Sequence, residues 1–537
     1  MLFSTPFNRV IALDPETGHQ IWRYDPGLDV KQERNEGFVS RGVAFWSDSA
    51  SNKSTACSRR VLFGTVDARL VALDATGGAL CEDFGTKGTV RLDAGIGYVQ
   101  TGQYGVTSPP VIAGDLVVVG SSMGDNRRVD LESGVVRAYD VRSGKLAWTW
   151  DPIPRRADDP AAKSWPDSGA GITGGANAWA PLSVDSKRAL IFVPTGSPST
   201  DYYGGHRKGA NDYANSVVAL EAKSGRVKWH FQVVHHDLWD FDVPAQPTLA
   251  TIEKDGAPRD VVIVATKMGH LFILDRDSGL PVFPIEERAV PASDVPGEVA
   301  SATQPFPVLP KPLHPEGRFT ANDVWGLEKG DTTFCRAIVA GKRNEGIFTP
   351  PSMKGTVMYP GFGGGINWGG VTYDPDRNVI IANTLRLAMW VKLEPRRSPT
   401  QGNQRGTPYT MTRAPVVSSK GIPCNPPPWG TLTAIDASTG LERWDIPLGS
   451  VPKLSAVPAS ALWGSPNFGG SIATAGGLTF IAATMDSHLR AFETSTGREL
   501  WKKELPAGGQ ATPMTYIWKG KQYVVIAAGG HSSLGTP

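Results

Sequence analysis

The stretch VRAYDVRSGKLAW, residues 136–148, contains the pattern that decides the fold of this chain. Apolar residues alternate up to an acid, Asp140, and a short polar segment then leads to Gly144 and Trp148. The alternation predicts a strand. The acid starts a turn by accepting backbone N–H groups, and glycine takes the left-handed conformation that the turn requires. A second strand follows, and its flat tryptophan can pack on a neighbouring sheet.

The same pattern returns at a fixed internal spacing. In five copies the acid precedes glycine by four residues and tryptophan by eight, at residues 10–22, 136–148, 217–229, 432–444 and 489–501. Two weaker copies follow the same spacing: residues 70–82 lack the tryptophan, and residues 271–283 have Phe283 in its place. Because each unit has a sheet face that it cannot bury alone, the copies must stack.

The intervals between the seven acids predict how many sheets there are. They measure 60, 66, 81, 54, 161 and 57 residues. The interval of 161, from Asp275 to Asp436, has room for two units, so we expect an eighth unit that has lost the motif. Eight antiparallel sheets stacked radially make an all-β, eight-bladed β-propeller with tryptophan-docking motifs. The excess over a plain blade of about 40–50 residues predicts long loops on one face, at residues 152–178, 197–213, 284–330 and 391–428.

The composition supports one large domain and excludes several partners. The 61 glycines and 43 prolines among 537 residues indicate many turns and few long helices. A net charge of +2 with interspersed signs argues against nucleic-acid binding and against a polybasic membrane patch. Because the chain has no run of about 18 apolar residues and its first residues lack a charged start and an apolar core, we expect neither a transmembrane helix nor a signal peptide. We interpret residues 1–537 as a single domain with trimmed ends, in which strands from the two ends share a blade.

The four cysteines fall into two groups. Cys57 and Cys81 flank a strand hairpin, whereas Cys335 and Cys424 are 89 residues apart. An even count with one close pair fits two disulfides, Cys57–Cys81 and Cys335–Cys424, and hence an oxidising compartment such as a periplasm. The alternative is four buried free thiols.

The loop VVHHDLWDFDVPAQPTLA, residues 233–250, gathers proton-handling groups outside regular structure. Taken alone, Asp237, Asp240 and Asp242 would be expected to cap turns, as loop aspartates commonly do. His235 and His236 are an alternative pair of zinc ligands, although adjacent histidines point in different directions.

This loop and three further blocks carry a resemblance to a known family. The blocks are ATKMGHLFILDRDSG at 265–279, EGIFTPPSMKGT at 345–356 and LPAGGQATPMTY at 505–516. Together with the tryptophan motifs they resemble the membrane-bound quinoprotein dehydrogenases, the pyrroloquinoline-quinone (PQQ) family that oxidises glucose, quinate or shikimate. The resemblance covers the whole chain. It implies ubiquinone as the electron acceptor, the periplasmic face of the inner membrane, and an N-terminal membrane domain, which we do not expect within residues 1–537.

The resemblance also implies which residues perform the chemistry. Asp240 would be the catalytic base, which removes the hydroxyl proton while hydride leaves the same carbon for the C5 carbonyl of PQQ; such assistance contributes roughly 10²–10⁴-fold. Lys267 would place a cation beside the quinone oxygens. Trp179 would form the floor under the PQQ ring. His531 and Asp486 match residues near the cofactor.

A divalent metal, Ca²⁺ or Mg²⁺, is the second group that the family implies. Such ions need hard oxygen ligands and act as Lewis acids on the quinone carbonyl. Asp125 and Asn126 match the candidate ligands, and Ser199 falls where the glucose enzymes carry a threonine. The alternative for Asp125 and Asn126 is an ordinary turn pair.

Two departures from the glucose enzymes favour another substrate. Gly37 stands where those enzymes carry a histidine, and Phe362 where they carry an asparagine. The loss of two polar contacts resembles the quinate/shikimate branch, whose substrates are carboxylated cyclohexane polyols. We then expect an arginine to bind the carboxylate, with Arg41 and Arg386 as candidates. Glucose or another polyol remains the alternative.

Two readings from other classes stay open. A non-catalytic propeller scaffold that binds proteins would keep the tryptophan motifs without needing Asp240, Lys267 and Trp179. A metal hydrolase built on His235, His236 and Asp237 would be active without a quinone.

Overall fold

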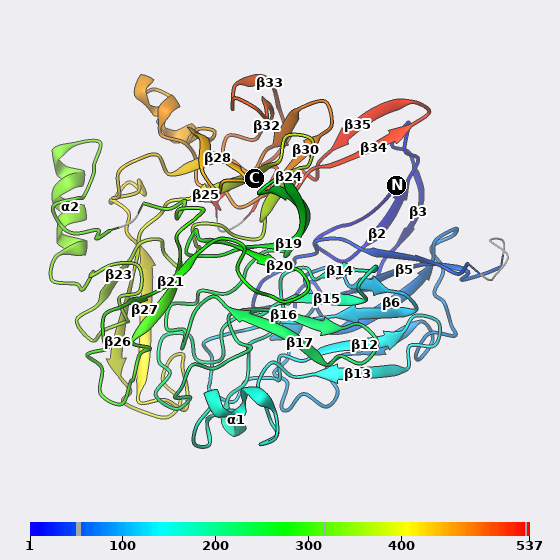
Figure 1. Cartoon of the computed structure of the whole chain (residues 1–537), viewed down its shortest axis with the longest axis horizontal. Coiled ribbons are helices and arrows are strands. Elements are labelled where there is room, and N and C mark those ends of the chain that lie inside the picture. The colour runs from blue at the N-terminus through cyan, green and yellow to red at the C-terminus, as the bar shows by residue number, and fades with distance from the viewer. Residues whose placement is uncertain (50–54, 316, 532–533, 537) are drawn as a thin grey trace. The chain divides into compact units, whose positions relative to one another are not determined.

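The computed structural model describes residues 1–49, 55–315, 317–531 and 534–536 (Figure 1). Nearly all regular structure is antiparallel strand, as the motif predicts. The chain forms two compact units, one of residues 1–200 and 206–232 and the other of residues 201–205 and 233–537.

The first unit contains four sheets in chain order. The first has three strands, β1 (Leu2–Ser4), β2 (Val10–Leu13) and β3 (Gln20–Tyr24). The second has β4 (Ala44–Ser47), β5 (Arg59–Gly64), β6 (Arg69–Asp74) and β7 (Thr89–Arg91). The third has β9 (Val111–Ala113), β10 (Leu116–Val119), β12 (Val136–Asp140) and β13 (Leu146–Trp150). The fourth has β14 (Ser183–Asp185), β15 (Leu190–Pro194), β16 (Ser216–Glu221) and β17 (Val227–Gln232). The short strands β8 (Tyr104–Gly105) and β11 (Ser122–Met123) pair separately, and the helical turns are η1 (Pro160–Ser164) and α1 (Gly169–Ile172).

The second unit contains three more sheets of the same kind. They are β18 (Thr248–Lys254), β19 (Ala257–Ala265) and β20 (Leu271–Asp275); then β24 (Val371–Asp374), β25 (Val379–Leu385), β28 (Gly430–Asp436) and β29 (Glu442–Pro447); then β30 (Ser471–Thr474), β31 (Leu478–Ile481), β32 (His488–Glu493) and β33 (Glu499–Glu504). The remaining elements are β21 (Ile285–Ala289), β22 (Thr303–Pro307), β23 (Thr356–Met358), β26 (Met389–Pro395), β27 (Tyr409–Pro415), β34 (Met514–Trp518), β35 (Lys521–Val525), the helix α2 (Lys329–Val339), η2 (Pro452–Leu454) and η3 (Pro458–Leu462).

The repeated motif builds its turn as the sequence predicts. In the copy at β12 and β13, Asp140 Oδ1 accepts hydrogen bonds from the backbone N–H of Arg142 (3.2 Å) and of Ser143 (2.7 Å). Gly144 follows with a φ of +69° and donates its N–H to the Asp140 carbonyl oxygen. The turn therefore needs both the acid and the glycine.

In three copies the tryptophan lies on the glycine of the next motif. Trp148 Nε1 donates to the Ala222 carbonyl oxygen at 2.9 Å, and a Cβ added to Gly225 would lie 2.5 Å from Trp148 Cε3. Trp22 packs in the same way on Gly78, and Trp444 on Gly497. Because no side chain would fit under the indole, glycine serves both the turn and the packing between sheets.

Within each unit, apolar clusters join each sheet to the next. In the second unit one cluster holds Ile263 and Ile273 of the β18–β20 sheet together with Ile380 and Ile435 of the β24–β29 sheet. These two sheets therefore pack on each other directly. The prediction of an extra stacked unit between Asp275 and Asp436 is wrong.

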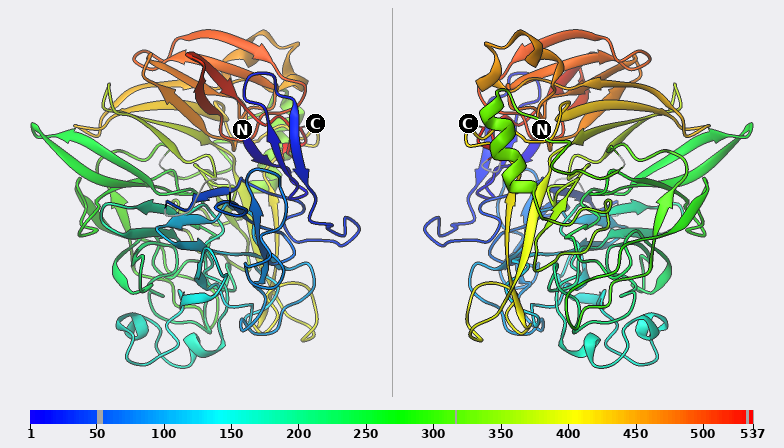
Figure 2. Two further views of the ribbon diagram at one scale, coloured as in Figure 1. Left: turned by 90° about the vertical axis from the view of Figure 1, so that its right-hand side faces the viewer. Right: turned by 90° about the vertical axis from the view of Figure 1, so that its left-hand side faces the viewer.

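The 161-residue interval is instead filled by structure outside the stack. It contains the β21–β22 hairpin, α2 and the three-stranded sheet β23–β26–β27, of which β23 precedes β24 and the strands β26 and β27 are inserted between β25 and β28. Figure 2 shows α2 beside the long strands β26 and β27. Seven described sheets carry the motif, and β34 and β35 form a further two-stranded sheet. The count of eight blades stays a prediction.

Both predicted disulfides are present. Cys57–Cys81 and Cys335–Cys424 have Cα atoms 5.8 Å and 5.6 Å apart, within the range that a disulfide spans. The second bond ties α2 to the segment that leads into β28. In the described part of the chain, none of the helices combines the length and the apolar character that crossing a membrane requires.

Candidate active site

The irregular loop that precedes β18 places Asp240 by means of a neighbouring carboxylate. Asp237 accepts hydrogen bonds from the backbone N–H groups of Trp239, Asp240 and Phe241, at 3.1 to 3.2 Å. Asp237 is thus a structural residue. Asp240 has a φ of +62° and its side chain is 6% exposed. A non-glycine residue in this conformation is strained, and such strain clusters at functional sites.

Lys267, in the turn between β19 and β20, holds the Asp240 side chain. Its Nζ donates to Asp240 Oδ1 (2.7 Å), to the Asp240 carbonyl oxygen (2.8 Å) and to Asp242 Oδ2 (2.9 Å). These acceptors match the three N–H donors of an ammonium group. Burial by itself lowers the pKa of Lys267, but the carboxylates of Asp240 and Asp242 outweigh it and raise the pKa above its ordinary value. The lysine is therefore charged and fixed.

Arg413, on β27, brings a second cation to the same carboxylate. Its Nη1 donates to Asp240 Oδ2 at 3.1 Å and to the Tyr202 hydroxyl at 2.6 Å. Its guanidinium carbon lies 3.9 Å from the centroid of the Phe362 ring. Tyr202 is 1% exposed, and burial is the main cause that raises the pKa of its phenol well above the ordinary value. A neutral hydroxyl and two cations thus surround the Asp240 carboxylate.

The glycine run at residues 361–365 packs against the turn that bears Lys267. A Cβ added to Gly364 would lie 2.8 Å from Lys267 Cα, and the Gly365 N–H donates to the Lys267 carbonyl oxygen at 2.5 Å. Only residues without a side chain allow this approach. The run therefore forms tight turns and positions Phe362.

The two loop histidines have carboxylate partners of their own. His236 Nε2 lies 2.8 Å from Glu298 Oε1, and both side chains are nearly buried. Glu298 Oε2 accepts the Gly204 N–H, which ties the segment of residues 201–205 to the loop. His235 Nε2 lies 3.1 Å from Glu287 Oε1. Among the residues that the structure describes, no group of three metal-ligating side chains includes either histidine.

In the first unit, Trp179 carries a cation on its ring. The guanidinium carbon of Arg41 lies 5.3 Å from the ring centroid, and the Trp179 carbonyl oxygen accepts the Ser108 hydroxyl at 2.6 Å. Burial is the main cause that lowers the pKa of Arg41 to about 10, so the guanidinium is still charged at neutral pH. A flat ligand could therefore stack only on the opposite face of the indole.

The predicted metal ligands of the first unit lie near one another. Ser199 Oγ donates to the Arg128 carbonyl oxygen at 2.6 Å, which places Ser199 beside the turn that bears Asp125 and Asn126. Asn126 is 4% exposed and has a φ of +54°. In the second unit, Asp201 and Asp240 have carboxylate oxygens within 4.8 Å of each other.

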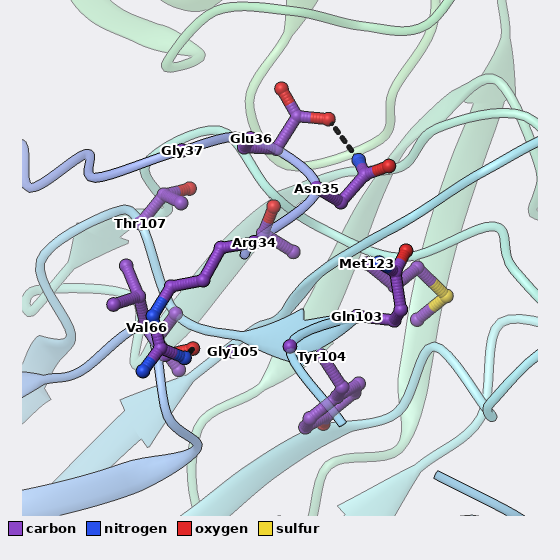
Figure 3. A pocket seen from close by; sticks show the side chains of 13 residues that line it. Arg34, Asn35, Glu36, Gly37, Val66, Gln103, Tyr104, Gly105, Thr107 and Met123 are labelled. Carbon is purple, nitrogen blue, oxygen red and sulfur yellow. Dashed lines mark hydrogen bonds between the residues drawn. The ribbon is translucent and has the colours of Figure 1, made fainter. Parts of the chain in front are cut away.

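Gly37 lies at a small cavity of the first unit, shown in Figure 3. The cavity measures about 20 Å³ and is lined by residues 34–37, 102–107 and 122–123, with Val66. A single water molecule needs a cavity of roughly 10–15 Å³. The cavity therefore has room for about one water and not for a cyclic polyol.

Asp486 and His531 are held by neighbours of their own. Asp486 accepts from Arg490 Nη2 at 2.5 Å and from the Ser450 N–H at 2.8 Å. Burial alone would raise the pKa of Asp486, but these partners outweigh it and lower the pKa to about 2. The His531 ring lies 4.9 Å from that of Trp368. None of these contacts involves Asp240 or Lys267.

Three residues around Asp240 were missed in the sequence. Arg413 belongs to YTMTRAP, an ordinary strand far along the chain, and nothing local marks it. Asp201 and Tyr202 directly follow the segment that contains Ser199, so an acid two residues beyond a predicted ligand was an available signal.

Comparisons with known proteins show the family of this chain. The family model of the glucose/ethanol/alcohol dehydrogenase β-propeller domain matches residues 1–524. Quinoprotein glucose dehydrogenase A of Acinetobacter calcoaceticus is 40% identical, over 100% of this chain and 70% of the relative. Quinate/shikimate dehydrogenase (quinone) of Acinetobacter baylyi is 39% identical, over 98% of this chain and 69% of the relative.

A solved structure shares the fold. Quinohemoprotein alcohol dehydrogenase from Comamonas testosteroni superimposes with a TM-score of 0.71 at 24% identity, over 98% of this chain and 69% of that one. The family match, the similarity over the whole chain and the all-β fold together show that this chain belongs to the PQQ-dependent dehydrogenases with a β-propeller domain.

Proposed function

We propose that this chain oxidises a secondary alcohol of a cyclic polyol, quinate or shikimate, with PQQ as the bound oxidant and ubiquinone as the electron acceptor. It would act as one PQQ-binding propeller domain of eight blades, at the periplasmic face of the inner membrane. One observation carries the proposal: the Asp240 carboxylate is held by Lys267 on a strained, buried loop.

Asp240 would act as the general base. Lys267 fixes one carboxylate oxygen, so the other is directed toward Arg413 and Tyr202. In this position Asp240 would accept the hydroxyl proton while a C=O bond forms at the carbinol carbon. A base of this kind contributes roughly 10²–10⁴-fold. Because its three N–H groups already have acceptors, Lys267 would support the reaction by orienting Asp240 and by its charge.

The residues present fit a flat, anionic cofactor. Bound PQQ would supply the two-electron acceptor for the hydride that leaves the carbinol carbon. Trp179 offers an aromatic face, and Arg41, on its other face, contributes positive charge. The positions of Asp486 and His531 near the cofactor stay predictions that rest on the resemblance.

The metal ligands would be hard oxygen donors, which Ca²⁺ and Mg²⁺ both prefer. Asp125, Asn126 and Ser199 are the proposed set, supported by the contact of Ser199 with the 125–128 turn. The acidic pair of Asp201 and Asp240 suits the same kind of ion.

The choice of substrate rests on Phe362, because the cavity beside Gly37 has room for about one water only. Phe362 presents an aromatic ring against Arg413, where an asparagine would offer hydrogen bonds to a sugar. A site with an arginine beside the base suits an acidic polyol. Glucose is the second candidate, because a glucose dehydrogenase is as similar to the chain as the quinate/shikimate enzyme is.

The test is reconstitution of the purified protein with PQQ and Ca²⁺ or Mg²⁺, followed by dye reduction with quinate, shikimate and glucose in parallel. Asp240→Asn should abolish turnover while PQQ still binds, and Asp255→Asn, at an exposed hairpin tip, should change neither. Retained turnover in Asp240→Asn would show that the base is misassigned. Dye reduction without PQQ would favour a different class of enzyme. A wild-type protein that reduces no dye with any of the three substrates would favour a non-catalytic scaffold that binds proteins.

A further inference from the structure

Arg413 differs from the other cation at Asp240 in where it comes from and in its access to solvent. It lies on β27, in the sheet that is inserted outside the stacked sheets. Its side chain is 28% exposed, whereas that of Lys267 is 7% exposed. Arg413 therefore forms the more open side of the Asp240 environment.

The guanidinium of Arg413 is held in a defined orientation. The Phe362 ring lies under its plane at 3.9 Å, and the Tyr202 ring lies 5.4 Å away. The Tyr202 hydroxyl fixes Nη1 at 2.6 Å. Stacking of this kind together with a hydrogen bond preorganises the planar fork of an arginine, which matches the two oxygens of a carboxylate.

Arg413 is a second cation at Asp240, in a cluster that also holds the Asp201 carboxylate, which lies within 4.8 Å of the Asp240 carboxylate. Lys267 already supplies a positive charge to Asp240 and is itself balanced by Asp242. Another cation nearby makes a carboxylate a weaker proton acceptor. An anionic group on the substrate would give the exposed side of Arg413 a partner that Lys267, with its three acceptors, cannot serve.

The arginines suggested by the sequence have other contacts. Arg386 Nη2 bonds to the Leu313 carbonyl oxygen and to Asp445 Oδ2, both at 3.1 Å. Arg41 lies on the ring of Trp179. Arg413, by contrast, donates directly to the Asp240 carboxylate.

We propose that Arg413 is the residue that binds the carboxylate of a polyol-acid substrate and so orients the reacting hydroxyl toward Asp240. This inference rests on the proposed function and names the group that selects acidic over neutral polyols. The inserted β23–β26–β27 sheet then has a function, since it carries the specificity residue to the base.

The experiment compares a charged substrate with its uncharged counterpart. kcat and KM are measured for quinate and for quinate methyl ester with the PQQ-loaded wild type and with Arg413→Met and Arg413→Lys. For Arg413→Met, kcat/KM for quinate should fall roughly 10- to 150-fold, the effect of losing a hydrogen-bonded charged contact, mainly through a higher KM. For the ester, kcat/KM should fall much less in Arg413→Met. For quinate, the kcat/KM of Arg413→Lys should lie between those of the wild type and Arg413→Met.

A matched control is Arg288→Met, because Arg288 also stacks on a phenylalanine, Phe306, at 4.9 Å, and pairs with Glu286 at 3.0 Å. It should leave both substrates unchanged. Arg413 could bind a carboxylate of the substrate or one of PQQ. The affinity for PQQ, measured by quenching of tryptophan fluorescence, distinguishes the two. Arg413→Met should bind PQQ as the wild type does.

Three outcomes would overturn the inference. Equal losses for quinate and its ester would mean that Arg413 serves only Asp240. A weakened affinity for PQQ with an unchanged ratio between quinate and ester would assign Arg413 to the cofactor's carboxylates. A wild type that oxidises glucose but not quinate would refute the proposed substrate and the role of Arg413 together, whereas the first two leave the proposed function intact.

Discussion

Replacing Lys267 by methionine tests the core of the site through stability. The substitution removes contacts of 2.7, 2.8 and 2.9 Å and leaves Asp240 and Asp242, whose side chains are 6% and 9% exposed, without their shared counter-ion. Breaking a buried ion pair from one side costs about 3–5 kcal/mol. Because Arg413 still pairs with Asp240, we expect Lys267→Met to lower the free energy of unfolding by about 3 kcal/mol, near the lower end of this range.

The assay is urea unfolding of the cofactor-free protein, followed by tryptophan fluorescence. Lys502→Met is the matched control, because that side chain is 57% exposed and its partner is 3.8 Å away, so the expected loss is about 0–1 kcal/mol. Adding Asp242→Asn to Lys267→Met should recover part of the loss, with a coupling of about 0.5–3 kcal/mol. If Lys267→Met costs no more than Lys502→Met, the ammonium lies in solvent and the description of the site is wrong.

The dependence on pH gives a second check on the same residue. The pKa of Lys267 is raised in the folded protein. The stability that Lys267 contributes is therefore fully present below its pKa in the unfolded chain, about 10.4, and is lost only as pH rises through its higher pKa in the folded protein. The stability difference between wild type and Lys267→Met should therefore be constant from about pH 6 to pH 9. A difference that disappears in this range would contradict a charged, paired lysine.

Two further predictions concern the stacked sheets. Gly225→Ala and Gly256→Ala each place a side chain at positive φ, +69° and +76°, but only the alanine at 225 would meet Trp148, at 2.5 Å. Gly225→Ala should therefore lower the unfolding free energy by about 1–3 kcal/mol more than Gly256→Ala does. Equal shifts of the thermal unfolding midpoint would refute the packing role of Gly225. Asp486→Asn should cost about 2 kcal/mol at neutral pH, from a pKa of about 2 against 3.8. That contribution is present above the unfolded pKa and lost as pH falls through about 2, so unfolding titrations should show the difference shrinking below about pH 4; a constant difference would exclude the carboxylate as its source.

The repeat was predictable because its signals are local. Asp140 and Gly144 make their turn with neighbours only a few residues away, so spacing alone identified the sheets. The same reasoning failed in the long interval before Asp436, because the interval's length cannot distinguish a stacked sheet from an inserted one. Only the contact of Ile263 and Ile273 with the following sheet decided that question.

By itself, the sequence determined the kind of sheet, the family and the loop that carries Asp240, and it favoured the two disulfides that the structure confirms. The tertiary structure decided what surrounds that carboxylate. Lys267 is 27 residues from Asp240 along the chain, and Arg413 is 173 residues away. No periodicity or turn signal links residues so far apart. They meet because packed sheets and inserted strands fix the loops between them, and the charges that converge on Asp240 are a property of that packing.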